Sequence, residues 1–130
     1  GYNRSLLVMS GGKLTEILPN KGTIGEKTGV KKTFTNHTLS PQQGDVFYLY
    51  SDGYGDQFGG PKQKKFKTAT LKDLLMSVAD KPMFEQKKII EQTFDEWKGS
   101  GEQTDDITVI GIRVWQNEKA TKWKGEWERQ

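Results

Sequence analysis

The sequence has no cysteine and only one histidine, His37, among its 130 residues. The lack of cysteine excludes disulfide frameworks, thiolate zinc sites and cysteine nucleophiles. One histidine cannot complete a site that needs two imidazoles, and a Ser-His-Asp triad would have to use His37. We expect His37 in the middle of a strand, where a solvated or core histidine is more common than a catalytic one.

Long apolar runs are absent as well, and no stretch approaches the roughly eighteen apolar residues of a membrane span. The apolar run at residues 6–9 is too brief for a secretory signal. We therefore expect no membrane contact by this segment and a cytoplasmic location. The net charge of +3 is a mild excess of lysine, which does not by itself indicate a nucleic-acid partner.

Alternating and apolar stretches predict the strands. A hairpin is expected across residues 5–19, with its turn at Gly11-Gly12. Three further strands are expected at residues 30–40, 46–51 and 107–115. The strand at 46–51 and the first half of the last strand are apolar at nearly every position, which predicts central strands covered on both faces.

Two adjacent helices are predicted between the last two strands. Thr70 suits the N-cap of the first helix, and Pro82 suits the first turn of the second, which stops at Gly99. Two helices in series among strands are typical of an α+β fold, in which the helices pack on an antiparallel sheet. A chain of 130 residues has room for only one such domain.

Three carboxylates lie where two of the predicted strands end and begin. Asp52 follows the strand at 46–51, and Asp105 and Asp106 precede the last strand. If these strands are antiparallel neighbours, the carboxylates crowd one sheet edge and require a compensating cation or protonation. Oxygen ligands without His or Cys indicate Mg²⁺ or Mn²⁺ rather than zinc. Gly53 would support such a site, because it has no side chain to obstruct an ion or its waters.

Ordinary turn chemistry is the alternative for these aspartates. Asp-Gly and Asp-Asp pairs are common at strand ends because aspartate bonds to its own backbone and tolerates left-handed geometry. The spacing alone favours this alternative, and the stretch matches neither a phosphate-binding loop nor a calcium-binding loop. Asp56 is near enough to Asp52 to be considered for the site, although a turn role is favoured.

Two longer motifs favour the metal site. The segment "GDVFYLYSDGYGDQFGG", followed by two helices and "EQTDDITVIGIRV", resembles the SpoIIE-like branch of the metal-dependent serine/threonine phosphatases, the protein phosphatase 2C superfamily. The segment "YNRSLLVMSGGKLTEILPNKGTIG" resembles the stretch that precedes these motifs in bacterial members, so the resemblance extends to Val114. It implies an α-β-β-α sandwich with antiparallel sheets and two Mg²⁺ or Mn²⁺ ions at one end. Water bridged between the ions would attack phosphoserine or phosphothreonine.

The resemblance also assigns roles to individual residues. It implies that Asp52 and Asp105 are metal ligands and that Asp106 supports the site, with no protein side chain acting as the nucleophile. The family's first metal motif, an Asp-x-Thr-Gly-His-Gly-like stretch that bridges both ions, has no match here. We therefore expect residues 1–115 to be the C-terminal part of a catalytic domain and residues 116–130 to be a polar, tryptophan-containing tail. We also expect this fragment to be inactive or nearly so and to bind metal weakly.

For the parent protein, the resemblance implies a bacterial signalling phosphatase under the control of a sensory domain. Its substrate would be a phosphoprotein, such as an anti-sigma-factor antagonist. A non-catalytic interaction domain of the same fold is the alternative. A basic nucleic-acid-binding domain is a third interpretation, but the lysines around Phe66 are better explained as a solvated loop. Open sheet edges in an incomplete sandwich predict self-association, so a homo-oligomer is also expected.

Overall fold

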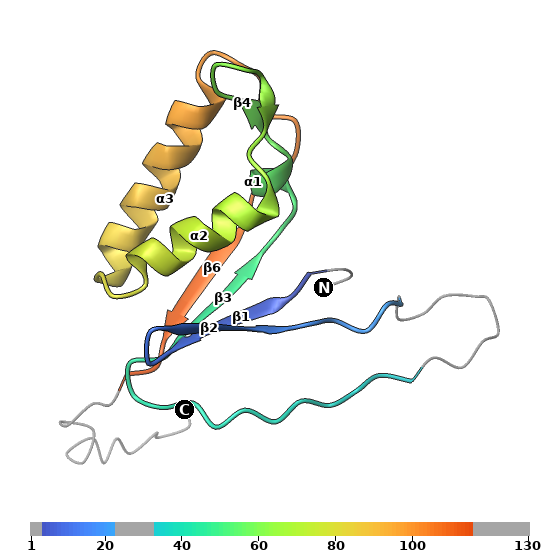
Figure 1. The fold of residues 1–130 in the computed structure, drawn as a ribbon, viewed down its shortest axis with the longest axis vertical. Helices are drawn as coiled ribbons and strands as arrows, with labels where there is room; N and C mark the ends of the chain where they lie inside the picture. Colours follow the sequence, from blue (N-terminus) through green and yellow to red (C-terminus); the bar gives the residue numbers. More distant parts are fainter. Residues whose placement is uncertain (1–3, 23–32, 116–130) are drawn as a thin grey trace, which may run out of the picture.

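The computed structural model describes residues 4–22 and 33–115. In this part of the chain, four antiparallel strands form a sheet in the order β2-β1-β3-β6 (Figure 1). Neither of the long helices that accompany the sheet has the length and hydrophobicity to span a bilayer. The sheet strands are β1 (Leu6–Ser10), β2 (Lys13–Ile17), β3 (Val46–Tyr50) and β6 (Val109–Arg113).

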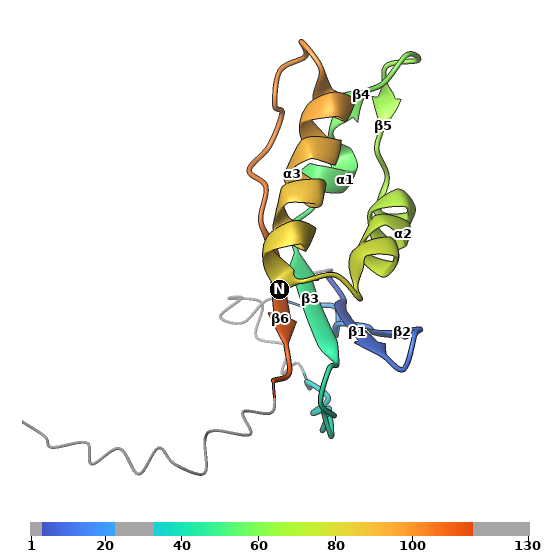
Figure 2. The same cartoon turned by 90° about the vertical axis from the view of Figure 1, so that its left-hand side faces the viewer.

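The remaining elements connect β3 to β6. They are α1 (Gly53–Asp56), a short hairpin of β4 (Phe58–Gly59) and β5 (Lys64–Lys65), α2 (Thr68–Val78) and α3 (Met83–Lys98). Figure 2 shows α3 in front of α1, with α2 beside it. The α+β class, with two adjacent helices on an antiparallel sheet, is thus confirmed.

The first two strands form the predicted hairpin. Gly11 and Gly12 have φ angles of 55° and 77°, the left-handed values that a tight two-residue turn requires. The prediction of a strand at residues 30–40 is wrong for its described part, because residues 33–40 have no strand and His37 lies exposed among them. The amide of Thr35 donates instead to Oδ1 of Asn20 at 2.7 Å, so a side chain replaces the partner strand that the alternating pattern would need.

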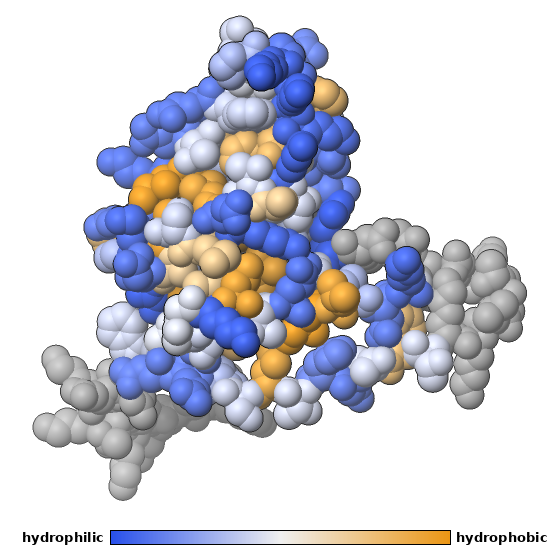
Figure 3. Space-filling model, viewed as in Figure 1, coloured by the Kyte–Doolittle hydropathy of each residue, from blue (hydrophilic) through white to orange (hydrophobic). Residues whose placement is uncertain are grey.

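Only one face of the sheet is covered by helices, which corrects the prediction of two buried faces. Val46, Tyr48 and Tyr50 of β3 are buried on the helix side. On the other face, Ile110 and Ile112 of β6 are 46% and 55% exposed. Apolar side chains also reach the surface over α2 and α3 (Figure 3). The apolar strands therefore predict that both faces of the sheet are covered, but the described residues cover only one of them. Self-association through the open faces and edges stays a prediction.

Buried polar contacts fix α3 to the sheet. The hydroxyl of Tyr48 donates to Oε1 of Gln86 at 2.7 Å, and both side chains are 1% exposed. Nε2 of Gln86 then donates to the carbonyl of Lys81 at 2.9 Å, and Nη2 of Arg113 donates to the same carbonyl at 2.7 Å. Burial raises the pKa of Tyr48 to about 12. The neutral hydroxyl therefore ties the sheet to the corner between α2 and α3.

The helix ends agree only in part with the sequence. Gly99, with φ of 55°, ends α3 as predicted, and Pro82 lies directly before its first residue. The prediction of Thr70 as the N-cap of α2 is wrong, because this helix begins at Thr68 after Lys67, which has φ of 77°. The amide of Lys67 donates to the carbonyl of Gly55 at 2.8 Å, so a tertiary contact sets this helix start.

We predict that Tyr48→Phe lowers the free energy of unfolding by about 1–3 kcal/mol, because Oε1 of Gln86 loses its buried donor. Tyr50→Phe is the matched control, since Tyr50 is also buried but its hydroxyl makes no hydrogen bond to another described residue. Urea denaturation followed by circular dichroism measures both variants. Equal losses in the two variants would show that the Tyr48–Gln86 bond contributes nothing specific.

Candidate metal site

The pairing of β3 with β6 brings the predicted aspartates to one end of the sheet. The register aligns Tyr50 with Val109, and beyond it the amide of Ser51 donates to the carbonyl of Thr108 at 2.9 Å. Asp52 follows the end of β3 and therefore lies beside the loop in which Asp105 and Asp106 precede β6. The strands are antiparallel neighbours, which is the condition under which the sequence analysis brought the carboxylates together.

Ser51 fastens this end of the sheet with its side chain. Its hydroxyl donates to the carbonyl of Asp106 at 3.1 Å and accepts from the amide of Thr108 at 2.9 Å. These two bonds hold the backbone on both sides of Ile107 against the end of β3. The sequence analysis did not identify Ser51, and a single serine at a strand end carries no signal that would have revealed it.

Gly53 allows the two backbones to approach each other closely. It is buried, and a Cβ atom at this position would collide with the carbonyl of Asp106 and lie 3.0 Å from Cγ1 of Ile107. The space left by the missing side chain is thus filled by the loop that precedes β6. The expectation that Gly53 leaves room for an ion or its waters is therefore corrected: Gly53 instead sets the distance between the chains that carry Asp52 and Asp106.

The Asp52 carboxylate pairs with a cation that the sequence analysis missed. Nη2 of Arg4 lies 2.7 Å from Oδ2 of Asp52, and the two side chains are 30% and 49% exposed. The hydrogen bond and the charge of the Arg4 guanidinium hold the pKa of Asp52 below its usual value. The antiparallel pairing of β1 with β3, which aligns Leu7 with Tyr48, is what brings Arg4 to this end of the sheet.

Asp105 and Asp106 lie in a loop that is held by hydrogen bonds within it. Oδ1 of Asp105 accepts from the amide of Asp106 at 2.8 Å, and the carbonyl of Asp105 accepts from Nε2 of Gln103 at 2.9 Å. Both aspartates are exposed. The turn chemistry considered for the sequence is therefore present, and it leaves Oδ2 of Asp105 free of any hydrogen bond to the rest of the described chain.

The donor set fits part of a site for a hard divalent cation. Asp52 and Asp105 offer carboxylate oxygens at a solvent-accessible sheet end, where water can supply further ligands. Across residues 4–22 and 33–115, no three His, Cys, Asp or Glu side chains converge on one point, so the expected crowding of Asp52, Asp105 and Asp106 is wrong. This arrangement can hold one side of a metal centre but does not enclose an ion.

Asp56 has a different contact. Its Oδ1 atom lies 3.0 Å from Nζ of Lys65, so Asp56 pairs with the β4–β5 hairpin. That hairpin corrects the prediction of a simple loop around Phe66. Phe66 itself is buried, and its ring packs edge-on against Tyr54 and Trp97 with centroid distances of 5.1 and 5.4 Å. It therefore does not offer a stacking surface to nucleic-acid bases.

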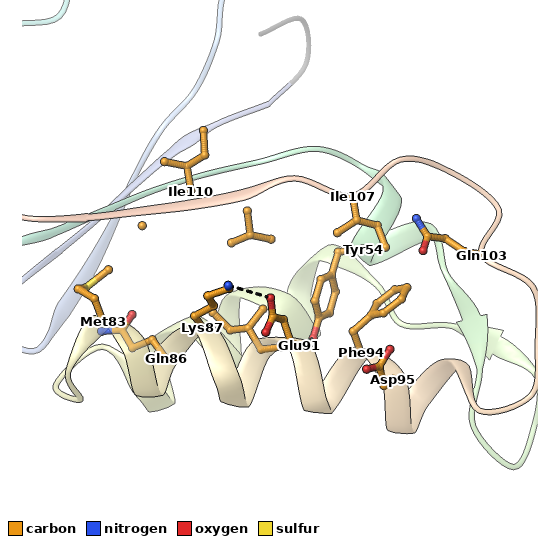
Figure 4. A pocket seen from close by; sticks show the side chains of 13 residues that line it. Tyr54, Met83, Gln86, Lys87, Glu91, Phe94, Asp95, Gln103, Ile107 and Ile110 are labelled. Carbon is orange, nitrogen blue, oxygen red and sulfur yellow. Dashed lines mark hydrogen bonds and ion pairs between the residues drawn. The ribbon is translucent and has the colours of Figure 1, made fainter.

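A groove of about 850 Å³ lies between α3 and the chain leading through β6. Figure 4 shows Tyr54, Phe94 and Ile107 toward one end of it and Met83 toward the other, with the Lys87–Glu91 ion pair on α3. The lining combines apolar side chains with charged and amide side chains of α3, and it includes none of the candidate metal ligands. The groove adjoins the loop that carries Asp105 and Asp106 through Gln103 and Ile107, but those carboxylates do not line it.

Comparison with known proteins gives one consistent family. The model for stage II sporulation protein E (SpoIIE) matches residues 1–115. The SiaA-PP2C domain of Pseudomonas aeruginosa is similar in structure, with a TM-score of 0.75 and 31% identity over 88% of this chain and 44% of that domain. No curated protein matches the chain.

Two structures from Bacillus subtilis have the same fold at 19% identity. The PP2C phosphatase domain of SpoIIE, solved with a fragment of its regulatory domain, has a TM-score of 0.59 over 86% of this chain and 32% of that one. The SpoIIE phosphatase domain in a crystal form without domain swapping has a TM-score of 0.55 over 98% and 50%, respectively. This chain thus spans half or less of each of these structures.

We predict that Gly53→Ala destabilises the fold by about 1–3 kcal/mol, because the new methyl group would push the Asp106 backbone away from the end of β3. Gly101→Ala is the control, since Gly101 lies in an exposed loop where the nearest atom to a Cβ is the Lys98 carbonyl oxygen at 3.0 Å. Thermal unfolding compares the two variants. A Gly53→Ala variant as stable as Gly101→Ala would contradict the close approach.

Proposed function

This chain belongs to the SpoIIE family of PP2C-type phosphatase domains, and we propose that it supplies one side of the metal centre of a protein serine/threonine phosphatase. The observation that carries the proposal is the β3–β6 pairing, which places Asp52 and Asp105 at the same end of the sheet. Both side chains are exposed there, so a metal ion and a phosphorylated substrate could reach them.

In this proposal, Asp52 and Asp105 are the ligands of Mg²⁺ or Mn²⁺, and Asp106 and Gly53 support them. When bound, the metal supplies a water of lowered pKa that can attack the phosphorus of phosphoserine or phosphothreonine. The protein's own contribution is placement. Ser51 fixes the loop that carries the second carboxylate, and Gly53 lets that loop lie close against the end of β3.

Two carboxylates do not complete the centre. An Asp-x-Thr-Gly-His-Gly-like stretch, which the family resemblance assigns to the bridging ligand, does not occur in residues 1–130. We therefore propose that these residues alone bind a divalent metal weakly and turn over little or no substrate. The missing carboxylate would have to come from chain outside this segment.

The substrate we propose is a phosphoserine or phosphothreonine protein in a bacterial signalling pathway, with an anti-sigma-factor antagonist as one example. A non-catalytic interaction domain of the same fold is the competing proposal. The two differ in whether Asp52 and Asp105 bind metal, because an interaction domain has no need of paired carboxylates at this sheet end. Metal binding and phosphate release therefore test the proposal separately.

The metal site is tested with NMR, which detects weak binding. Mn²⁺ added to this chain is expected to broaden the amide resonances of residues 51–53 and 105–107 first, because paramagnetic relaxation falls off steeply with distance. Asp52→Asn and Asp105→Asn should each remove this selective broadening. Asp80→Asn is the control, because Asp80 lies exposed between α2 and α3. Selective broadening that survives in both ligand variants would rule these carboxylates out.

The phosphatase chemistry is tested in a chimera in which residues 4–115 replace the matching segment of the SiaA-PP2C domain. We expect Mn²⁺-dependent phosphate release from a phosphoserine peptide. Asp52→Asn in the chimera should lower the rate at least about a hundredfold, because even residues that only support metal ligands cost about 10- to 100-fold. Asp80→Asn is again the control. A folded chimera without activity, beside an active SiaA-PP2C domain, would favour the interaction-domain proposal.

A further inference from the structure

Arg4 and Asp52 form a contact between chain segments far apart in sequence. Nη2 of Arg4 lies 2.7 Å from Oδ2 of Asp52, although the two residues are nearly fifty positions apart. Arg4 lies just before β1, which runs beside β3 in Figure 1. The register of these strands, Leu7 opposite Tyr48, brings residues 4 and 5 alongside the end of β3. The ion pair is therefore a product of the sheet itself.

The charges around Asp52 are arranged on two sides. Arg4 approaches from the β1 side, and the loop with Asp105 and Asp106 lies on the β6 side, bonded through Ser51. A guanidinium keeps its proton at all ordinary pH values and donates through a planar fork of N–H groups. Arg4 thus places a permanent positive charge on the carboxylate that the proposed function assigns to the metal.

We propose that Arg4 is a positioning residue that holds the Asp52 carboxylate in the metal-free protein and competes with the divalent cation for it. This inference rests on the proposed function, because it takes Asp52 to be a metal ligand. The two cations are drawn to the same carboxylate: its Oδ2 accepts from Arg4, and the metal would bind an oxygen of the same group. The guanidinium and the metal ion are both positive and would repel each other across the Asp52 carboxylate. A bound metal must therefore displace the guanidinium or bind beside its charge.

The competition sets how tightly the sheet end binds metal. With Arg4 in place, Asp52 is neutralised and oriented before any ion arrives. Entry of the metal then costs the chain an ion pair. Without Arg4, the carboxylate is free for the metal and the local potential is more negative. Metal affinity should therefore rise when the guanidinium is removed, even though no ligand has been added.

Mn²⁺ affinity tests the inference, measured through the electron paramagnetic resonance signal of free Mn²⁺. We expect Arg4→Met, which keeps side-chain length and removes charge, to tighten binding about twofold to fivefold, the range for a partly exposed ion pair. Arg4→Lys keeps the charge and should fall between the two. Lys65→Met is the matched control: it removes the same charge from the Asp56 pair and should leave the affinity unchanged.

The double variant Arg4→Met/Asp52→Asn separates this inference from the proposed function. It should bind as weakly as Asp52→Asn alone, because Arg4 acts through Asp52. Unchanged or weaker binding by Arg4→Met, beside a loss of binding by Asp52→Asn, would overturn the inference and leave the metal site standing. Unchanged binding by Asp52→Asn would instead overturn the site. The NMR spectra of the variants show whether each is folded. If Arg4→Met does not fold, the Mn²⁺ affinity of Arg4→Lys decides the question.

Discussion

The antiparallel pairing of β3 with β6 is the contact on which the rest of the structure depends. It joins residues 46–50 to residues 109–113, so residues 51–108 leave the sheet and return to it at the same end. That segment contains α1, α2 and α3, and its helices lie over one face of the sheet. The same pairing aligns the end of β3 with the start of β6. The core and the candidate site therefore share one register, and a slip of one residue would turn every side chain of a strand to the opposite face.

The two faces of the sheet differ in how well they match the apolar pattern of its strands. Continuous apolar runs predict strands with two covered faces, and the runs at β3 and β6 are of this kind. The described residues cover only the face with Tyr48, while Leu49, Ile110 and Ile112 stay exposed on the other. This chain spans 44% of the similar SiaA-PP2C domain. An apolar pattern indicates that a surface is buried, but it does not identify the segment that covers it.

Local signals predicted the features that depend on local energetics. The Gly11-Gly12 turn and the end of α3 at Gly99 both require left-handed backbone, which glycine adopts without strain. The shared end of Asp52 and Asp105 followed from the sequence only on the condition that β3 and β6 are antiparallel neighbours, a condition that the structure meets. The start of α2, the Ser51 bonds and the Arg4–Asp52 ion pair did not follow from the sequence. Each of these depends on which distant backbone or side chain lies nearby, and no spacing within the sequence reports that.

The two proposed ligands are prepared for a metal in different ways. Asp52 is held by the charge of Arg4, whereas Asp105 is held by the amide of Asp106, its own neighbour in the chain. A neutral amide can remain bonded to one carboxylate oxygen while the other oxygen binds a cation, so Asp105 gives up little when a metal arrives. Asp52 must either give up its contact with Arg4 or bind the metal beside that positive charge. If the sheet end is a metal site, its affinity for the ion therefore depends mainly on Asp52. Arg4 sets that affinity without being a metal ligand.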